Sequence, residues 1–429
     1  MIRMTTEPAP ARLVDRSVAR IAWLPIGAAV GALANSVAGS AAGLLAVRLG
    51  GEAWFAGWPQ AMLVIGTALA ALAISRASRR GGRSRALAWG AALGGIGAAV
   101  VVWSAIAGAI VPMLLGSLVF GAGNAAVMLS RYAAAERAAP EHRVRSLTRL
   151  LVATSIGAVI GPLLLAPSDV AGQAMGMPPL AGCFALGALG FAVAAGALAA
   201  SAPRVPGAPV GTTGTVAPRA AAEVGSALGT APADGVRVTD AARTARRDTT
   251  LGVGILSLAN VVMVIVMTVT PLHLEHLNAD LGTVGLLISA HIAAMFAPSP
   301  LSGLLVGRWG AERMAAVSAV VLGAACVMAA SVPHSLPGVA VSVVVIGAGW
   351  NLALVAGSAV LARDAEERVR LRREGWGEVG MGLSAACGGA ASGMLLHAAG
   401  FTSVAATAAV FAAAMAAAAA AARRAVRRL

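Results

Sequence analysis

Long apolar stretches alternate with short polar segments along almost the whole chain. Each stretch is long enough for a helix to cross the hydrocarbon layer of a membrane, which takes about 20 residues at a rise of 1.5 Å each. Backbone groups in lipid must be satisfied within the protein, which excludes an open sheet, and the period-two alternation of a membrane barrel is missing. The pattern predicts an all-α membrane protein with twelve transmembrane helices, over Ile21–Ala46, Trp54–Ile74, Ala86–Ser104, Ile110–Ser130, Leu150–Ala166, Pro179–Ala200, Leu251–Leu272, Leu281–Val306, Ala315–Val332, Leu336–Leu361, Val379–His397 and Phe401–Ala422.

Arginines are sorted among the polar segments. They fill the tails and every second connection between the apolar stretches, and only Arg48 lies on one of the other connections. Short arginine-rich loops stay on the cytoplasmic side of a membrane. The sequence therefore predicts a multi-pass protein of the plasma (inner) membrane with both termini in the cytoplasm.

The polar segments also divide the chain. Residues 201–248 are rich in Ala, Gly, Pro and Thr and show no apolar period, which indicates a flexible cytoplasmic linker with room for a short surface helix. We therefore expect an N-terminal cytoplasmic tail and a basic C-terminal cytoplasmic tail around two six-helix bundles, with boundaries at 1–20, 21–200, 201–248, 249–422 and 423–429.

Composition narrows the function classes. The chain is 58% hydrophobic, carries a net charge of +14 and has no lysine. A basic excess often indicates nucleic-acid binding, but these arginines lie in juxtamembrane loops, where lipid headgroups are the expected partners and no nucleic acid is needed. Cys183, Cys326 and Cys387 fall inside apolar stretches and form no disulfide framework or metal site. There is no Walker motif and no catalytic cluster, so we expect neither an enzyme nor a cofactor.

The two halves of the chain repeat each other. Three short runs of the first half return at nearly the same spacing in the second. Ser78-Arg79-Arg80-Gly81 returns as Gly307-Arg308-Trp309-Gly310, Gly121-Ala122-Gly123 as Gly347-Ala348-Gly349, and Arg143-Val144-Arg145 as Arg368-Val369-Arg370. Parallel repeats of this kind can build a central pathway with alternating access.

The repeated loop resembles a signature of the major facilitator superfamily: Gly, three residues, Asp, Arg, any residue, Gly, then basic residues. The second copy has Gly303, Gly307, Arg308, Gly310 and Arg313. The first copy is degraded to Arg79 and Gly81, with Ile74 in place of the leading glycine, and both copies lack the aspartate. The resemblance implies the fold of that family, in which two pseudo-symmetric six-helix bundles enclose a central cavity.

A second motif resembles one that accompanies exporters in that family. Gly157, Gly161 and Pro162 match its Gly, three residues, Gly-Pro pattern, which allows close helix approach before a proline bend. Ordinary small-residue packing is the alternative. The resemblance points to the drug/proton antiporter group of the actinobacterial type. The chain departs from that group at Ser117, where an arginine is usual, and its first six apolar stretches hold no mid-membrane acid.

Two ionisable residues are candidates for proton coupling. His291 lies about ten residues into its apolar stretch, where an ionisable group is costly and therefore a functional candidate. A neutral histidine bonded to a neighbouring helix is the alternative. Glu378, with Glu374, lies at the start of the eleventh stretch, where the helix dipole also favours carboxylates.

Other polar residues could serve binding. Near mid-depth, polar side chains should face protein or a cavity, and the resemblance places the first, fourth, seventh and tenth helices around that cavity. The candidates for lining it are Asn35, Asn124, Asn260, Trp350 and Asn351, with hydrogen bonds between helices as the alternative. Arg131 is expected to reach the headgroups. His273, Glu275 and His276 include two types of metal ligand but lack the spacing of a metal site. We therefore expect them to lie at a helix end in contact with water.

These features together favour a monomeric secondary transporter. A cavity with methionines and few charges suits a small hydrophobic or amphipathic molecule. Export in exchange for protons is the leading mechanism. An importer or facilitator of a small metabolite and a non-transporting membrane scaffold or sensor remain as alternatives.

Overall fold

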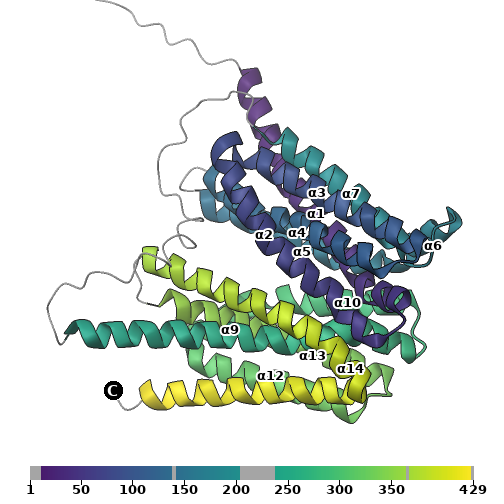
Figure 1. Ribbon diagram of the computed structural model, residues 1–429. Helices are drawn as coiled ribbons and strands as arrows, with labels where there is room; N and C mark the ends of the chain where they lie inside the picture. Colours follow the sequence, from purple (N-terminus) through teal and green to yellow (C-terminus); the bar gives the residue numbers. More distant parts are fainter. Residues whose placement is uncertain (1–10, 138–141, 203–236, 364–366, 427–429) are drawn as a thin grey trace, which may run out of the picture.

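The computed structural model describes residues 11–137, 142–202, 237–363 and 367–426. Every regular element in these ranges is a helix (Figure 1). In chain order they are α1 (Ala11–Gly50), η1 (Ala53–Gly57), α2 (Trp58–Gly81), α3 (Arg83–Ala107), α4 (Ile110–Arg137), α5 (Arg143–Leu163), α6 (Leu165–Ala174), α7 (Ala181–Ala200), α9 (Arg237–His276), α10 (Leu281–Phe296), α11 (Ser299–Trp309), α12 (Ala311–Ser331), α13 (Leu336–Ala362) and α14 (Glu367–Val426).

Within the described ranges, 11 helical stretches are long and apolar enough to cross a membrane. The last of them, Arg372–Arg424, contains two helices, because the backbone leaves the helical conformation at Ala399 and Gly400. One other span is broken. The eighth, Leu281–Trp309, runs through α10 and α11, and Pro298 between them removes a backbone donor. The predicted twelve-helix, all-α fold is confirmed.

Several predicted boundaries move. The fifth span ends at Leu163, close to the predicted Ala166, and a separate helix, α6, follows it to Ala174. Residues 237–248 are helical and belong to α9, so the end of the predicted linker is not flexible coil. The start of α1 at Ala11 likewise takes part of the predicted N-terminal tail into a helix. The rest of the predicted linker, 203–236, and the tails 1–10 and 427–429 lie outside the described residues.

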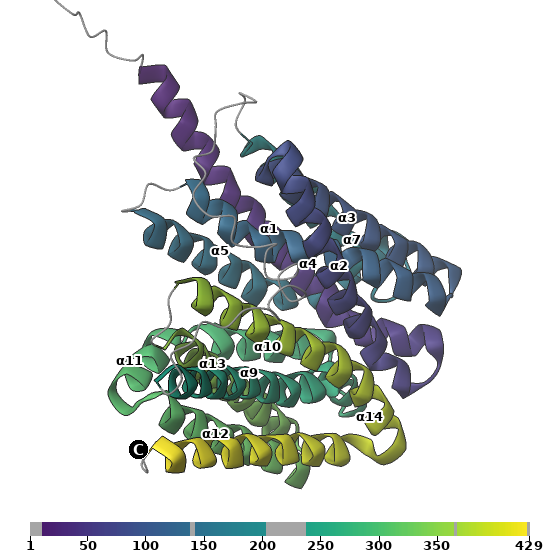
Figure 2. The same cartoon turned by 60° about the vertical axis from the view of Figure 1, so that its left-hand side comes forward.

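Helices α1–α7 form one bundle and α9–α14 a second, as both views show (Figures 1 and 2). Small residues let the helices approach closely within each bundle. A Cβ added to Gly94 of α3, for example, would lie 2.6 Å from the Cα atom of Gly123 in α4. We call the side formed by the helix ends next to 76–85, 131–149, 308–313 and 363–373 the arginine-rich end, and the side around η1 and 276–281 the far end.

The repeated loop takes the same backbone path in both halves. Gly82 follows α2 with φ 83° and ψ 144°, and Gly310 follows α11 with φ 86° and ψ 150°. The sequence comparison matched Gly81 with Gly310, which is wrong by one residue, since α2 continues as helix through Gly81. In the corrected register Arg80 corresponds to Arg308 and Arg85 to Arg313.

Each half carries an ion pair beside this loop, but with the charges exchanged. In the first half Arg83 at the start of α3 pairs with Glu136 near the end of α4, 2.6 Å apart. In the second half Glu312 at the start of α12 pairs with Arg363 directly after α13, 2.7 Å apart. Each repeat therefore has an ion pair beside this loop, with the charges exchanged and each partner shifted by one residue in this register.

Side-chain caps begin two helices of the second half. The carboxylate of Asp280 accepts a hydrogen bond from the backbone nitrogen of Thr283, 2.7 Å away, which lowers the pKa of Asp280. Ser335 caps α13 in the same way through the backbone nitrogen of Gly338, 3.2 Å away. Both caps lie at the far end and fix where the eighth and tenth spans begin.

Candidate functional site

The two bundles meet through their backbones toward the far end. A Cβ added to Gly57, which joins η1 to α2, would overlap the carbonyl oxygen of Gly389 in α14. One turn farther along α14, a Cβ on Gly393 would lie 2.5 Å from the carbonyl oxygen of Trp54. These positions permit only glycine at the observed separation, so the second and eleventh spans form a tight seam.

A second part of this seam joins the fifth and eighth spans. The hydroxyl of Ser289 in α10 donates to the carbonyl oxygen of Val159 in α5. A Cβ on Gly285, one turn earlier in α10, would overlap the carbonyl oxygen of Pro162. The segment of α5 around Pro162 is therefore another place where the first bundle touches the second.

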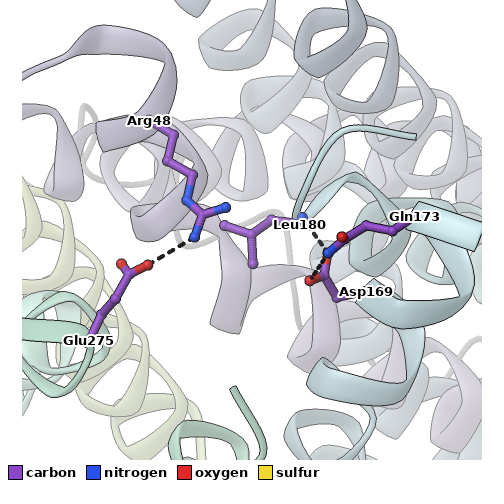
Figure 3. Close-up of polar contacts among 5 residues, drawn as sticks. All are labelled: Arg48, Asp169, Gln173, Leu180 and Glu275. Atoms are coloured by element: carbon purple, nitrogen blue, oxygen red, sulfur yellow. Dashed lines mark hydrogen bonds and ion pairs between the residues drawn. The ribbon is translucent and has the colours of Figure 1, made fainter. Parts of the chain in front are cut away.

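An ion pair crosses the seam at the far end. A guanidinium nitrogen of Arg48, at the end of α1, lies 2.8 Å from a carboxylate oxygen of Glu275 in α9 (Figure 3). The two side chains are 40% and 39% exposed. Arg48 is the one arginine that the sequence places away from the arginine-rich connections, and the structure gives it a partner in the other half of the protein.

Figure 3 also shows a buried carboxylate that the sequence analysis missed. Asp169 of α6 accepts hydrogen bonds from the backbone nitrogen of Leu180 and from the amide of Gln173, the latter at 2.8 Å. Leu180 has a φ of 69°, which is uncommon for a residue with a side chain. Asp169 thus holds the strained turn before α7. The only signal in the sequence was an acid shortly after the predicted end of the fifth span.

At the arginine-rich end, Arg131 of α4 reaches across to the second bundle. Its guanidinium lies 3.3 Å from a carboxylate oxygen of Glu378 in α14 and stacks over the ring of Tyr132. The Nε atom of Arg131 is buried without a hydrogen-bond partner. Arg131 therefore faces the other half of the protein.

The surroundings of Glu378 differ from the expected ones. Helix α14 begins at Glu367, so Glu374 and Glu378 do not lie in its first turn, and the dipole of the helix terminus does not account for them. Glu374 faces Arg370 one turn earlier, at 3.8 Å. Glu378 instead takes its partner from the opposite bundle.

The glycines of the exporter-like motif face their own bundle. A Cβ on Gly157 would overlap the carbonyl oxygen of Ala29 in α1, and one on Gly161 would lie 2.7 Å from the Cβ atom of Ser36. The hydroxyl of Ser36 in turn donates to the carbonyl oxygen of Ala158, 2.8 Å away. The motif thus fixes α1 against α5, and the carbonyl of Pro162 lies against Gly285 of the second bundle.

His291 is packed inside the second bundle. Its Nδ1 atom lies 2.7 Å from the carbonyl oxygen of Val343 in α13, and its side chain is 2% exposed. A carbonyl oxygen only accepts hydrogen bonds, so Nδ1 carries the proton. The Nε2 atom is buried without a partner. The structure places this ring between α10 and α13 rather than opposite the first bundle.

Three of the cavity candidates form two networks within the second bundle. Asn260 donates to the carbonyl oxygen of Met381 at 2.8 Å and accepts from the indole of Trp350 at 3.2 Å. Asn351 donates to the carbonyl oxygen of Met295 at 2.7 Å and accepts from the hydroxyl of Ser302 at 2.6 Å. Met295 and Ser302 flank the break between α10 and α11, so Asn351 stabilises that break.

The two candidates in the first bundle are less completely bonded. Asn124 of α4 donates to the hydroxyl of Thr67 in α2, 3.1 Å away. The side-chain oxygen of Asn35 in α1 is buried and has no hydrogen-bond partner. Ser117, in the slot where an arginine was expected from the resemblance, donates to the carbonyl oxygen of Met113 in its own helix.

The remaining polar groups do not converge. His273 bonds to the carbonyl oxygen of Pro333 at 2.7 Å and stacks on Phe401, while Glu275 pairs with Arg48. In the ranges that the structure describes, no three His, Cys, Asp or Glu side chains are grouped so that they could hold a metal ion. In the loop signature, Gly303 and Gly307 face open space, and Arg308 and Gly310 are exposed at the arginine-rich end.

Comparison with known proteins gives a consistent result. The family model described as Major Facilitator Superfamily matches residues 249–428. The uncharacterized MFS-type transporter YddS of Bacillus subtilis is 34% identical over 362 residues, which cover 84% of this chain and 80% of YddS. The riboflavin transporter RfnT of Brucella anthropi is 26% identical over 398 residues, covering 91% and 93% of the two chains.

Solved structures agree on the fold. A bacterial homologue of the human lysosomal transporter Spinster, in an inward-facing and occupied conformation, superposes with a TM-score of 0.72 at 13% identity and covers 97% of this chain and 98% of its own. A D-xylose–proton symporter gives a TM-score of 0.68 at 15% identity, covering 93% and 96% of the two chains.

Proposed function

Because this chain belongs to the major facilitator superfamily, we propose that it is a secondary transporter that exports a small hydrophobic or amphipathic molecule across the plasma membrane in exchange for protons. The observation that carries the proposal is the unequal contact between the bundles. They meet backbone to backbone toward the far end, whereas Arg131 and Glu378 join them by side chains at the arginine-rich end. Such a difference suits alternating access.

The arginine-rich end is the cytoplasmic end in this proposal, since arginines gather on the cytoplasmic side of membrane proteins. The conformation is then closed toward the outside and open, apart from the Arg131–Glu378 pair, toward the cytoplasm. A cytoplasmic substrate would enter between α4 and α14 and reach the space below the seam.

Several side chains of α1, α4 and α9 favour a weakly charged substrate. Met263 and Met267 of α9 are partly buried, and Met128 of α4 is 41% exposed. Thioethers adapt to irregular apolar ligands. The unpaired oxygen of Asn35 and the amide of Asn124 add polar groups that can orient a ligand.

Glu378 is the better candidate for proton coupling. Protonation of its carboxylate removes the charge that Arg131 faces, and so weakens the one described ion pair between the bundles at this end. His291 has no such link, because its ring bonds to α13 within one bundle. In this mechanism proton binding at Glu378 releases Arg131. The two bundles can then move apart, or close around substrate, at the arginine-rich end.

Import of a small metabolite is the second candidate. It is favoured by the likeness to RfnT, which is named as a riboflavin transporter. The same two states would serve transport in either direction.

Purified protein in proteoliposomes tests these proposals. Right-side-out and inverted vesicles would be challenged with neutral amphipaths, hydrophobic cations and riboflavin while a pH-sensitive dye reports the lumen. Export predicts that a substrate added on the arginine-rich side drives protons the other way, and that Glu378→Gln abolishes this movement. Uptake of riboflavin without proton exchange would support import instead. A protein that binds no compound and shows no ligand-dependent change in accessibility would act as a scaffold or sensor, which contradicts both.

A further inference from the structure

A groove lies on the outer surface of the second bundle, away from the first. It has a volume of about 490 Å³ and is lined by Trp309, Arg313, Ala316, Val317, Val320, Val321 and Arg423. These residues come from the end of α11, the start of α12 and the end of α14. Helix α12 and the last part of α14 lie side by side on the face turned from α1–α7 (Figures 1 and 2).

The wall of the groove is apolar and open. Val320 is 66% exposed, Trp309 47% and Val317 41%. On a helix that spans a membrane, such valines meet lipid, and tryptophan is typical of the boundary between hydrocarbon and headgroups. The groove therefore runs from the level of the headgroups into the hydrocarbon layer.

Its headgroup end is positively charged and has no counter-charge. Arg313 and Arg423 have no ion-pair or hydrogen-bond partner among the described residues, and no acid lines the groove. Glu312, the acid next to Arg313 in the chain, pairs with Arg363. The residues that follow Val426 are Arg427, Arg428 and Leu429, so the adjoining segment of the chain is basic and is not complementary to the groove.

We propose that this groove binds one anionic phospholipid of the leaflet at the arginine-rich end. The phosphate would lie between Arg313 and Arg423, with Trp309 at the level of the glycerol, and one acyl chain would follow Val317, Val320 and Val321. Arginine is suited to the phosphate because its planar guanidinium can donate two parallel hydrogen bonds. Two arginines converging over an apolar wall fit a charged headgroup that carries a hydrocarbon chain.

The repeat provides an internal control. In the register set by Gly82 and Gly310, Arg85 corresponds to Arg313. Helix α7, the counterpart of the last helix, has no basic residue in its final turn, so nothing there corresponds to Arg423. Among the described residues, the first bundle thus has one arginine at this position where the second has two, and we expect no lipid site at Arg85.

The test uses delipidated full-length protein in detergent, titrated with phosphatidylglycerol and followed by native mass spectrometry and by thermal unfolding. We expect one phosphatidylglycerol to bind more tightly than any further one. Each arginine near anionic lipid is worth about fivefold in affinity, so Arg313→Gln or Arg423→Gln should weaken binding about fivefold and the double variant about 25-fold. Arg85→Gln should leave the affinity unchanged. Wild-type affinity in the double variant would overturn the proposal.

Further experiments distinguish the possible ligands of the groove. Equal binding of phosphatidylethanolamine, or equal thermal protection by inorganic phosphate, would show that the groove does not select an anionic lipid. Val320→Trp fills the groove while both arginines stay, and it should weaken phosphatidylglycerol binding in a protein whose melting temperature without lipid is unchanged. Retained binding in that variant would contradict the acyl-chain seat. Truncation after Val426 should not change the affinity; a gain would mean that the tail occupies the groove.

Discussion

Gly82 and Gly310 occupy the same rare backbone conformation at corresponding places in the two halves, with φ near 85° in both and ψ values of 144° and 150°. This region of φ and ψ is essentially restricted to glycine. Each of these glycines lies between two helices without a longer loop, so both repeats reverse direction through a single residue.

Substitution at these glycines should strain the backbone. We expect Gly82→Ala and Gly310→Ala each to destabilise the protein by about 1–3 kcal/mol. The matched controls are Gly81→Ala and Gly307→Ala, because both glycines are helical and a Cβ there meets nothing within 4 Å. The controls should be neutral or slightly stabilising. Thermal unfolding in detergent measures the difference, and equal melting temperatures at Gly81 and Gly82 would contradict the assigned register.

The seam at the far end should depend on Gly57 far more than on Gly389. A Cβ at Gly57 overlaps the Gly389 carbonyl oxygen, whereas a Cβ at Gly389 meets the Gln60 side chain at 3.3 Å. Gly57→Ala should therefore favour the state that is open at the far end, and Gly389→Ala should not.

A single cysteine can report this shift. Gly39 of α1 is exposed and one turn from Gly43, where the bundles approach. With Cys183, Cys326 and Cys387 replaced, Gly39→Cys should react faster with an impermeant thiol reagent applied at the far end when Gly57→Ala is present. Equal labelling rates in the two alanine variants would show that the seam does not control access from the far end.

The Arg48–Glu275 pair should contribute little to closure. Both side chains are well exposed, and such pairs contribute about 0.2–1 kcal/mol, less at high salt. Arg48→Ala should raise the far-end labelling of Gly39→Cys by less than about fivefold. The charge-exchanged pair Arg48→Glu with Glu275→Arg should restore the slow rate at low salt. A loss of closure as large as that of Gly57→Ala would show that the ion pair, and not the backbone contact, holds the seam.

Substitutions at Glu378 and at His291 should have different effects on proton coupling and on stability. Glu378 is 46% exposed, so Glu378→Gln should keep the melting temperature and lose substrate-driven proton movement. His291→Leu removes a buried donor and should lower stability by about 1–3 kcal/mol while keeping proton movement. Proton flux in vesicles and thermal unfolding give both quantities. Loss of proton coupling in a folded His291→Leu protein would show that His291, and not Glu378, couples transport to protons.

Asn351 should matter for the broken eighth span. Asn351 is fully buried, and Asn351→Leu leaves the carbonyl oxygen of Met295 and the hydroxyls of Ser299 and Ser302 without this partner. We expect a loss of about 2–4 kcal/mol, from more than one unsatisfied buried group. Ser302→Ala removes one of these bonds and should cost less. Hydrogen exchange at Phe296 to Ser302 would rise in Asn351→Leu if the side chain stabilises the break.

The sequence was sufficient for the spans but not for the contacts between them. Arginine sorting and span length are local properties, and the twelve spans follow from them. The choice between Gly81 and Gly82 is not local, because either glycine could have ended α2. Likewise Asn260 and Asn351 had to face protein, yet their partners Met381 and Met295 lie on other helices. Arg131 and Glu378 are paired only by the packing of the two bundles.

Asp169 is a second case in which the sequence did not reveal a contact between distant residues. The fifth span was predicted to end at Ala166, shortly after Pro162, and proline often ends a helix. The chain instead resumes as α6, and the carboxylate is buried where it bonds to the backbone of Leu180. Nothing in the spacing of these residues reveals that bond.

The contact of Gly57 with Gly389 affects how well the membrane keeps its electrical potential. A living membrane carries an electrical potential, and any gap in a transporter lets ions run down it. Side chains that close a gap can rotate away within nanoseconds. Here main chain lies directly against main chain, and nothing at the contact can rotate without moving a whole helix. The barrier to leakage is therefore as slow to open as the movement of one bundle against the other, and the protein can wait for substrate without discharging the membrane.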